Sequence, residues 1–371
     1  MKGIYLHIPF CRSRCAYCDF YSTTDLDRRE RYVEALLSEW QQRRNEIKGP
    51  IATVYFGGGT PSLLSAQTVE RILTSLLQDE APREREITLE ANPDSISPEY
   101  LKSLKAAGVN RLSIGIQSLQ DDLLRTIGRP HNAEQALQAI EAAREAGFTN
   151  LSVDLMYGLP GQTSAQWKAD IETVLRFKPE HISTYCLSYE EGTRLTALRD
   201  KGEVQEQEDE TLNSLYDYLC QRLQQAGYEH YEVSNFALPG YKSQHNSHYW
   251  DRTPYIGLGA GAHSFDGERR SWNPNDIAAY IEGILAQSLT RESEQLTQEQ
   301  QHIEAVMLGL RTKEGIDAAL VEDKKETIED YLRRGLLVER CFRAHRYLKD
   351  KRYCATQEGI HILNDIIATL I

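Results

Sequence analysis

The stretch "GIYLHIPFCRSRCAYCDFYS", residues 3–22, contains the features that decide the fold of this chain. It opens on a short, mostly apolar run with two β-branched isoleucines, which is typical of a buried β-strand. Three cysteines, Cys11, Cys15 and Cys18, then fall within eight residues, and Phe20 stands two places later. A strand that leads into a loop with three thiols predicts a metal site at the carboxyl end of that strand.

The three thiolates favour an iron–sulfur cluster over structural zinc. Structural zinc takes four protein ligands, and no nearby cysteine supplies a fourth, so His7 or Asp19 would be needed. A [4Fe–4S] cluster held by three cysteines leaves one iron free for a small-molecule ligand. We therefore expect a cluster on this loop, with zinc as the weaker alternative.

Five more strand-like runs follow the cysteine loop, and helical patterns fill most of the gaps. The runs cover 51–56, 86–91, 110–116, 150–157 and 181–188, which with 3–8 makes six βα units. Residues typical of helix ends support this division, since Ser97 can cap a helix, Pro98 suits its first turn and Gly108 can end it. Repeated βα units favour a parallel sheet, and six of them predict an α/β fold, a (β/α)6 barrel that is left partly open.

Polar and glycine-rich motifs follow these strands, where such folds gather their chemistry. The glycines of 57–59 allow a ligand close to the backbone, whose N–H and C=O groups can hold an amino-acid moiety; alone, they also fit an ordinary turn. Glu90 can accept hydrogen bonds from a ribose, and Gln117 offers both a donor and an acceptor. Asp154 adds a carboxylate, and Arg129 follows Gln117 closely. We expect these groups to line one elongated ligand site.

Composition and charge narrow the class of protein. The chain has 371 residues, 40% of them hydrophobic and 26% charged, and no run approaches the ~18 apolar residues of a membrane span. The first residues do not fit a secretory signal, so we expect a cytoplasmic protein whose seven cysteines stay reduced. The net charge of −13 argues against nucleic acid as a partner. Residues 340–352 carry six basic residues against Asp350, which fits a solvated hairpin or a site for an anionic partner.

The spacing C-x3-C-x2-C after a first strand, with Tyr17 before the last cysteine, resembles the radical S-adenosylmethionine (SAM) superfamily. The motifs "YLHIPFC", "CAYCDFYS", "GGGTPSLL", "EANPD", "GIQS", "GRPH", "DLMYGLPGQT" and "YEEGT" resemble oxygen-independent coproporphyrinogen III oxidases and their relatives over nearly the whole chain. The resemblance implies cluster ligation by the three cysteines. It implies SAM binding by Tyr5, Tyr17, Gly58, Gly59, Thr60 and Glu90. Gln117, Arg129 and Asp154 match positions that line a second SAM in the oxidases.

Two features separate this chain from the oxidases. Phe20 stands where the oxidases carry a fourth cysteine. In this departure the chain resembles the HemW branch of heme chaperones. The segment "HNSHYW", 245–250, resembles the H-N-x-x-Y-W heme motif of that branch, in which His245 would be an axial ligand and the aromatic residues would face the porphyrin. A histidine in an aromatic-rich segment also fits a structural role. We expect a heme chaperone without oxidase activity, and the alternative is a coproporphyrinogen III oxidase.

The resemblance also predicts the organisation of the chain and its partners. We expect a radical SAM core over 1–235, a connecting region with the heme motif over 236–290 and a winged-helix-like domain over 291–371. The implied ligands are a [4Fe–4S] cluster, SAM and heme. The implied partner is an acceptor hemoprotein, with a membrane respiratory enzyme as one candidate and contact with a membrane surface as a consequence. Whether SAM is cleaved and whether the chain forms a homo-oligomer stay open.

Overall fold

Six parallel strands form the centre of the structure, a computed structural model that describes residues 2–81, 83–345 and 348–371. These strands lie side by side in chain order. They are β1 (Lys2–Ile8), β2 (Ile51–Gly58), β3 (Glu86–Ala91), β4 (Arg111–Gln117), β5 (Leu151–Tyr157) and β6 (His181–Cys186). The prediction of a parallel, partly open α/β barrel is confirmed, and β6 ends two residues before its predicted end.

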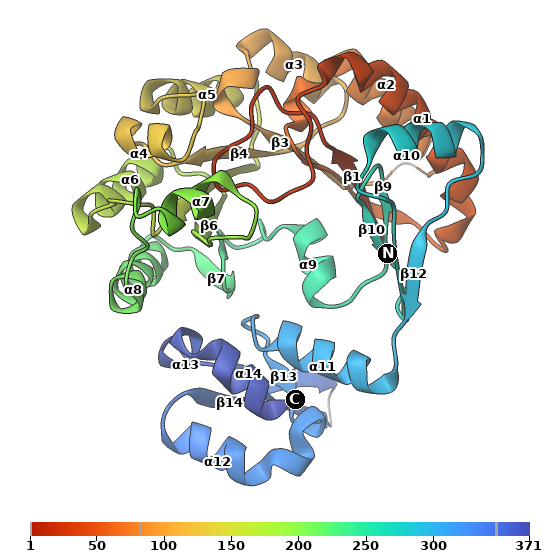
Figure 1. Ribbon diagram of the computed structural model, residues 1–371. Helices are drawn as coiled ribbons and strands as arrows, with labels where there is room; N and C mark the ends of the chain where they lie inside the picture. Colours follow the sequence, from red (N-terminus) through yellow and green to blue (C-terminus); the bar gives the residue numbers. More distant parts are fainter. Residues whose placement is uncertain (1, 82, 346–347) are drawn as a thin grey trace.

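Helices cover the outer face of this curved sheet (Figure 1). They are α1 (Arg29–Arg43), α2 (Ala66–Leu77), α3 (Pro98–Ala106), α4 (Asp121–Thr126), α5 (Ala133–Glu145), α6 (Ser164–Arg176) and α8 (Asp209–Gln225). Helix α7 (Arg194–Asp200) lies instead against the cysteine loop, where the N–H of Leu195 donates to the Ala16 carbonyl at 2.8 Å. Ser97 caps α3 as predicted, accepting from the N–H of Tyr100, and the structure adds capping boxes from Asn132 at α5 and Thr163 at α6. Short 3₁₀ turns lie at Leu26–Arg28, Arg44–Glu46, Pro61–Leu63, Pro93–Ser95 and Ala318–Lys324.

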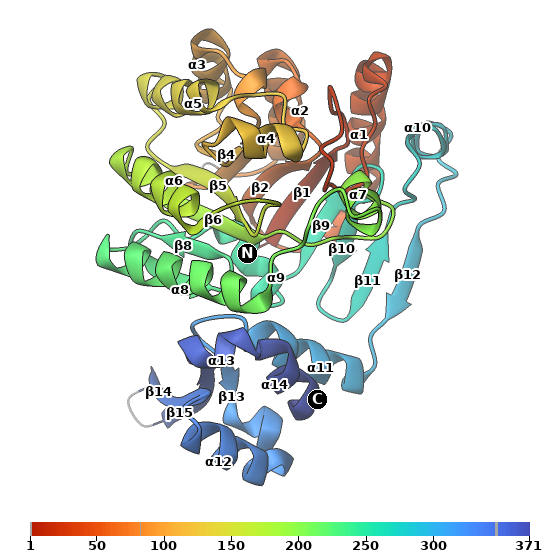
Figure 2. The same ribbon diagram turned by 60° about the vertical axis from the view of Figure 1, so that its left-hand side comes forward.

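The sheet extends beyond the six predicted strands at both edges. On one side β8 (Asn235–Ala237) and β7 (Glu229–Glu232) add antiparallel to β6. On the other side β9 (Tyr255–Leu258) pairs parallel with β1, and β10 (His263–Phe265), β11 (Arg269–Trp272) and β12 (Glu292–Gln295) continue antiparallel. Helix α9 (Gln244–Trp250) lies in the opening between these edges, and α10 (Ile277–Leu285) packs on α1 (Figures 1 and 2).

The C-terminal part has a separate hydrophobic core. It contains α11 (Gln298–Gly309), β13 (Ile316–Asp317), α12 (Lys325–Arg333), β14 (Leu337–His345), β15 (Leu348–Ala355), α13 (Gln357–His361) and α14 (Leu363–Leu370). The three strands form a small sheet in the order β13-β15-β14, and the buried core includes Val306, Ile328 and Ile366. The predicted limits of 1–235, 236–290 and 291–371 stay predictions; β12, just past the last limit, pairs within the large sheet.

The basic segment 340–352 forms most of the β14–β15 hairpin, although Arg346 lies outside the described residues. Arg352 donates to the carbonyl oxygens of Glu314 and Gly315 at 2.8 and 2.7 Å, and Lys351 pairs with Glu339 at 2.8 Å. These contacts fit a solvated hairpin. Of the helices in the described part of the chain, none is long and apolar enough to cross a membrane.

A buried carboxylate ties the added strands to the first helix. Glu39 on α1 is fully buried and accepts hydrogen bonds from Arg43 Nη1 at 2.9 Å and Asn273 Nδ2 at 2.8 Å. It also accepts from the Gly259 N–H at 2.9 Å and the Tyr280 hydroxyl at 2.8 Å. Because these partners come from α1, the segment after β9, the segment after β11 and α10, one side chain fixes the chain from 255 to 285 against the barrel.

We predict that Glu39→Ala lowers the free energy of unfolding by about 3–5 kcal/mol, because it leaves the Arg43 guanidinium buried beside unpaired polar groups. Urea unfolding followed by circular dichroism measures this loss. Glu34→Ala, at an exposed position of the same helix, is the control and should change stability by about 0.5 kcal/mol or less. Equal effects of the two substitutions would contradict the role given to Glu39.

Candidate functional site

The cysteine loop leaves the carboxyl end of β1 and is anchored at its base and at its tip. At the base, the N–H of Thr23 donates to the Pro9 carbonyl at 2.7 Å, and the N–H of Cys11 donates to the Thr23 carbonyl at 2.9 Å. At the tip, the N–H of Ala16 donates to the Ile127 carbonyl at 2.9 Å. The three predicted ligands, Cys11, Cys15 and Cys18, are free thiols, and each is partly exposed on this loop.

The glycine motif packs directly on the cysteine loop. The N–H of Gly59 donates to the Ile8 carbonyl at 2.9 Å, and the N–H of Thr60 donates to the Phe10 carbonyl at 2.8 Å. A Cβ at Gly59 would lie 2.8 Å from the Phe10 carbonyl oxygen and 3.0 Å from the Cys11 sulfur, so this position requires glycine. The Thr60 hydroxyl also reaches the Cys11 sulfur at 3.6 Å. The two motifs that the sequence singled out therefore form one surface.

Arg129 joins the loop to the neighbouring strands. Its Nη1 donates to the Cys15 sulfur at 3.5 Å, and its Nη2 donates to Asn92 Oδ1 at 2.8 Å and to the Gly115 carbonyl. Arg129, which the sequence placed in a ligand site, thus lies against the cysteine loop itself.

The donor set fits an iron–sulfur cluster better than a single ion. Burial raises the pKa of the Cys11 thiol and raises that of Cys18 to about 11, and metal coordination is what ionises such thiols at neutral pH. Within the described ranges, no three His, Cys, Asp or Glu side chains are grouped so as to hold one metal ion. In a cluster each thiolate binds a different iron, so the three sulfurs need not meet at one point.

Glu90 lies beside the glycine motif at the end of β3. It accepts a hydrogen bond from the Tyr55 hydroxyl at 2.8 Å and from the Gly58 N–H at 3.1 Å. Burial is the main cause that raises the pKa of Glu90 to about 7. A Cβ at Gly57 would come within 2.9 Å of the Tyr5 ring and 3.2 Å of Glu90 Oε1. Tyr5 and Glu90 therefore pack closely against the Gly57 backbone, where any side chain would collide with them.

Gln117 and Asp154 continue this site along the next two strands. Gln117 has a φ of 62°, and a Cβ at Gly115 would lie 2.8 Å from its Nε2. Asp154 accepts hydrogen bonds from Ser113 Oγ at 3.0 Å and Ser152 Oγ at 3.3 Å. Burial raises its pKa. Asp154 faces the barrel interior, and the assignment of both residues to one ligand site stays a prediction.

The two predicted tyrosines have different surroundings. The Tyr5 hydroxyl forms a hydrogen bond with His7 Nδ1 at 3.1 Å, and His7 Nε2 reaches the Tyr21 carbonyl at 2.9 Å, which links β1 to the cysteine loop. Tyr17 packs near Ile127 in a small apolar cluster beside the loop. Burial raises the pKa of both tyrosines.

His245 lies at the opposite end of the strands. The first N–H groups of α9, those of Gln244 and His245, donate to the Glu86 carboxylate, each at 3.0 Å. The His245 ring is 1% exposed, and its nitrogens form hydrogen bonds with Thr53 Oγ1 at 2.8 Å and the Tyr249 hydroxyl at 3.1 Å. Burial lowers its pKa to about 3, so the imidazole is neutral. An iron ligand at His245 Nε2 would have to displace Tyr249.

Several contacting residues were not identified from the sequence. Tyr55 holds Glu90, Asn92 holds Arg129, and Thr53 holds His245. The alternation of residues along β2, which puts Thr53, Tyr55 and Gly57 on one face, is the signal that could have found two of them. Asn92 belongs to the quoted "EANPD" motif, which carried no separate role.

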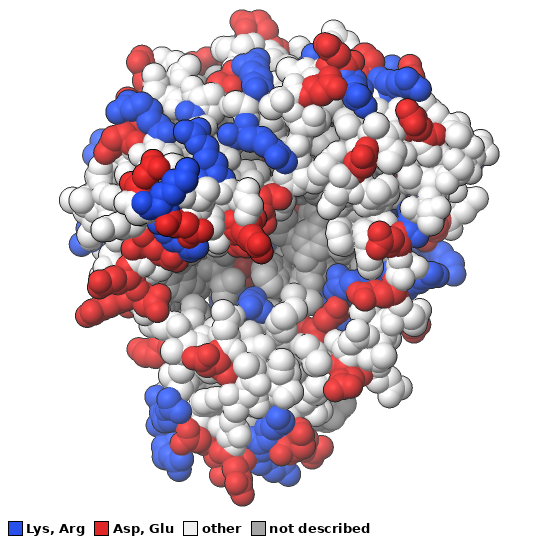
Figure 3. Space-filling model, in the orientation of Figure 1, with Lys and Arg blue, Asp and Glu red and all other residues white. Residues whose placement is uncertain are grey.

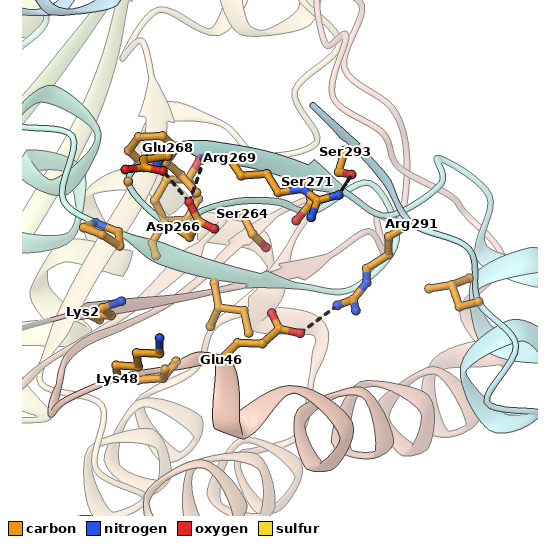
Figure 4. A pocket seen from close by; sticks show the side chains of 17 residues that line it. Lys2, Glu46, Lys48, Ser264, Asp266, Glu268, Arg269, Ser271, Arg291 and Ser293 are labelled. Carbon is orange, nitrogen blue, oxygen red and sulfur yellow. Dashed lines mark hydrogen bonds and ion pairs between the residues drawn. The ribbon is translucent and has the colours of Figure 1, made fainter. Parts of the chain in front are cut away.

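The surface offers two further features. Figure 3 shows a hollow in the middle of the molecule, with acidic and basic side chains interspersed around it. A separate cavity of about 890 Å³ lies on another part of the large sheet, near β10–β12 (Figure 4). Its lining includes Lys2, Lys48, Arg269 and Arg291, and Arg291 pairs with Glu46 at 3.4 Å. None of the predicted site residues lines this cavity.

Comparison with known proteins gives a consistent set of relatives. The radical SAM superfamily matches residues 5–174. The heme chaperone HemW of Lactococcus lactis is 36% identical over 98% of this chain and 96% of its own length, and HemW of Bacillus subtilis is 38% identical over 87% of each chain. The structure of coproporphyrinogen III oxidase HemN from Escherichia coli covers 99% of this chain and 89% of its own, with a TM-score of 0.81 and 22% identity, which shows a shared fold.

We predict that Glu90 makes stability depend on pH. Its folded pKa of about 7 exceeds the ordinary value of 4.5, so its contribution is complete below pH 4.5 and is lost as pH rises through 7. Glu90→Gln should remove part of this decline, measured by thermal unfolding from pH 4.5 to 8. Some decline should stay, because burial also raises the pKa of Glu232 to about 7. Parallel pH profiles for the two proteins would contradict the assignment.

Proposed function

This chain belongs to the HemW family of heme chaperones within the radical SAM superfamily, and from that premise we propose that it binds a [4Fe–4S] cluster, SAM and heme and passes heme to an acceptor protein. The observation that carries the proposal is similarity over nearly the full length of both chains. Superfamily membership implies the cluster and SAM. Heme binding and transfer are part of the proposal because the similar proteins are named heme chaperones.

Cys11, Cys15 and Cys18 are the cluster ligands in this proposal. A bound cluster would supply one electron at a time and an iron position for the methionine part of SAM. Thr60 and Arg129 position the sulfur atoms of Cys11 and Cys15 by donating hydrogen bonds to them. The backbone bonds of 59 and 60 to the loop hold the three sulfurs on one side of the barrel.

SAM is proposed to bind next to this loop. The residues assigned to it are Tyr5, Tyr17, Gly58, Gly59, Thr60 and Glu90, with Gln117, Arg129 and Asp154 as candidates for a second molecule. Support comes from the glycine turn, whose backbone carries no side chain at Gly57 to Gly59, and from Glu90, whose two oxygens face Tyr55 and the Gly58 N–H. Glu90 can exchange these partners for the hydroxyl groups of a ribose.

Heme is proposed to bind at α9, with His245 as the axial ligand. The neutral imidazole suits iron, and Tyr249 and Trp250 offer flat aromatic surfaces. Because Tyr249 occupies Nε2, heme binding in this scheme begins with the release of that hydrogen bond. His248 is the competing ligand, since its Nδ1 is buried without a partner.

The rival function is decarboxylation of coproporphyrinogen III. The structural likeness to HemN concerns the fold. Phe20, at the position of the oxidases' fourth cysteine, is 65% exposed beside the cysteine loop and offers no thiol. Anaerobic incubation of the reconstituted protein with coproporphyrinogen III decides between the two: the chaperone proposal expects no product, and turnover would refute it.

We predict that Cys15→Ser lowers bound iron well below four per chain and removes the broad absorption near ~400 nm that such clusters show. The reason is that three thiolates provide all of the protein ligation. Cys186→Ser, at an exposed cysteine outside the loop, is the control and should keep full iron content. Iron and sulfide analysis after anaerobic reconstitution measures both proteins. Full iron content in the Cys15 variant would remove it from the ligand set.

We predict that His245→Ala weakens heme binding and changes the Soret band, whereas Tyr249→Phe binds heme at least as well as wild type. The phenylalanine removes the hydroxyl that occupies Nε2 but keeps the ring. Heme titration by absorption, with iron content as a check on the cluster, measures this series. His248→Ala is the control and should have a much smaller effect. A larger loss of heme binding in His248→Ala than in His245→Ala would assign the axial ligand to His248 instead.

A further inference from the structure

Arg111 is a buried cation without a partner. It is the first residue of β4, its side chain is 1% exposed, and its Nε and Nη1 atoms are buried with no hydrogen bond. No ion pair or hydrogen bond links this guanidinium to any residue that the structure describes. The protein therefore buries a guanidinium with two unsatisfied donors here, and Glu90 and Asp154 interact with its charge only at longer range.

A second unpartnered group lies beside it. Thr88 on β3 is directly opposite Arg111 in the strand register, is fully buried, and has an Oγ1 atom without a hydrogen bond. Both side chains face the barrel interior, because Ser113, two residues after Arg111, donates to Asp154 there. Two adjacent strands therefore present one cation and one hydroxyl to the same interior space.

The carboxylates nearby are already engaged. Glu86 accepts from the two N–H groups at the start of α9, and Glu90 accepts from Tyr55 and Gly58. Asp154 accepts from serine hydroxyl groups. Since none of these three acidic side chains makes a direct contact with Arg111, its donors are free for a group from outside the chain.

We propose that Arg111 and Thr88 form a site inside the barrel that takes a carboxylate group of a bound ligand. This rests on the proposed function, which supplies two ligands with free carboxylates: heme through its propionates, and the candidate second SAM through its methionine part, since that of the first SAM is assigned to the cluster iron. A guanidinium can donate to both oxygens of one carboxylate, and the threonine hydroxyl can add a third hydrogen bond.

Heme is the source that the position favours. Arg111 is near enough to His245 that its charge contributes to the lowered pKa of that imidazole. Both lie toward the amino ends of the strands, whereas the cysteine loop lies at the carboxyl ends. A porphyrin whose iron is at α9 would thus bring a propionate toward Arg111.

The first test uses wild-type protein and heme dimethyl ester, in which both carboxylates are blocked. Heme should bind about 10- to 100-fold more tightly than the ester, which is what one charge-assisted hydrogen-bonded contact contributes. Arg111→Met should lose this preference, and Arg111→Lys should keep part of it. Thr88→Val should reduce it less. Arg176→Met, at an exposed position of α6, is the control for net charge and should behave as wild type.

The second test distinguishes the source of the carboxylate. The reconstituted protein is titrated with SAM and with decarboxylated SAM, and the ratio of the two affinities is compared between wild type and Arg111→Met. If Arg111→Met lowers the preference for SAM over decarboxylated SAM but leaves the preference for heme over its ester unchanged, the site takes the carboxylate of SAM. This result still supports a carboxylate site. Absence of heme binding by wild type would refute the proposed function, while the SAM titration would still decide on Arg111.

Two results would overturn the inference. One is equal affinity of wild type for each acid and its blocked or decarboxylated form. The other is a folded Arg111→Met protein, checked by circular dichroism, that keeps the preferences of wild type. Because the wild-type comparison needs no variant, the inference can be refuted even if Arg111→Met does not fold.

Discussion

The close packing of the cysteine loop on the glycine turn after β2 is the constraint on which the rest of the site depends. Two backbone hydrogen bonds, from Gly59 to Ile8 and from Thr60 to Phe10, hold the loop where a Cβ at Gly59 would collide with it. This contact fixes the thiols at the carboxyl end of the sheet. It also places them beside Glu90, whose carboxylate closes the same turn through the Gly58 N–H.

The barrel interior carries more charge than an ordinary core, and its two ends differ. Along β3 and β5, the partly buried carboxyl groups of Glu90 and Asp154 have raised pKa values, and Glu90 lies beside the glycine turn that holds the cysteine loop. Toward the amino ends, α9 closes the opening with a neutral His245, and the Nε and Nη1 atoms of Arg111 have no hydrogen-bond partner among the described residues. Such an interior is costly for folding alone, because buried charges and polar groups require partners. Ligands that bring complementary groups explain why it is built this way.

The sequence predicted what depends on local pattern. The six central strands, the helix caps and the neighbouring cysteine and glycine motifs all follow from alternation and spacing within a few dozen residues. The extensions β7–β8 and β9–β12 did not follow, because their strands are only three or four residues long, and because β8 and β9, which join them to the barrel, pair with the distant strands β6 and β1. The enclosed state of His245 likewise depends on Thr53 and Tyr55, far away on β2, so the motif alone could not reveal it.

The central claim is that one chain holds a cluster through its cysteine loop and heme through a separate region. It is tested most directly by titrating heme into anaerobically reconstituted wild-type protein while absorption and the electron spin resonance of the reduced cluster are recorded together. We expect a saturable Soret band with an unchanged cluster signal, because the cysteine loop and α9 lie at opposite ends of the strands. Heme that displaces the cluster, or that fails to saturate, would contradict it.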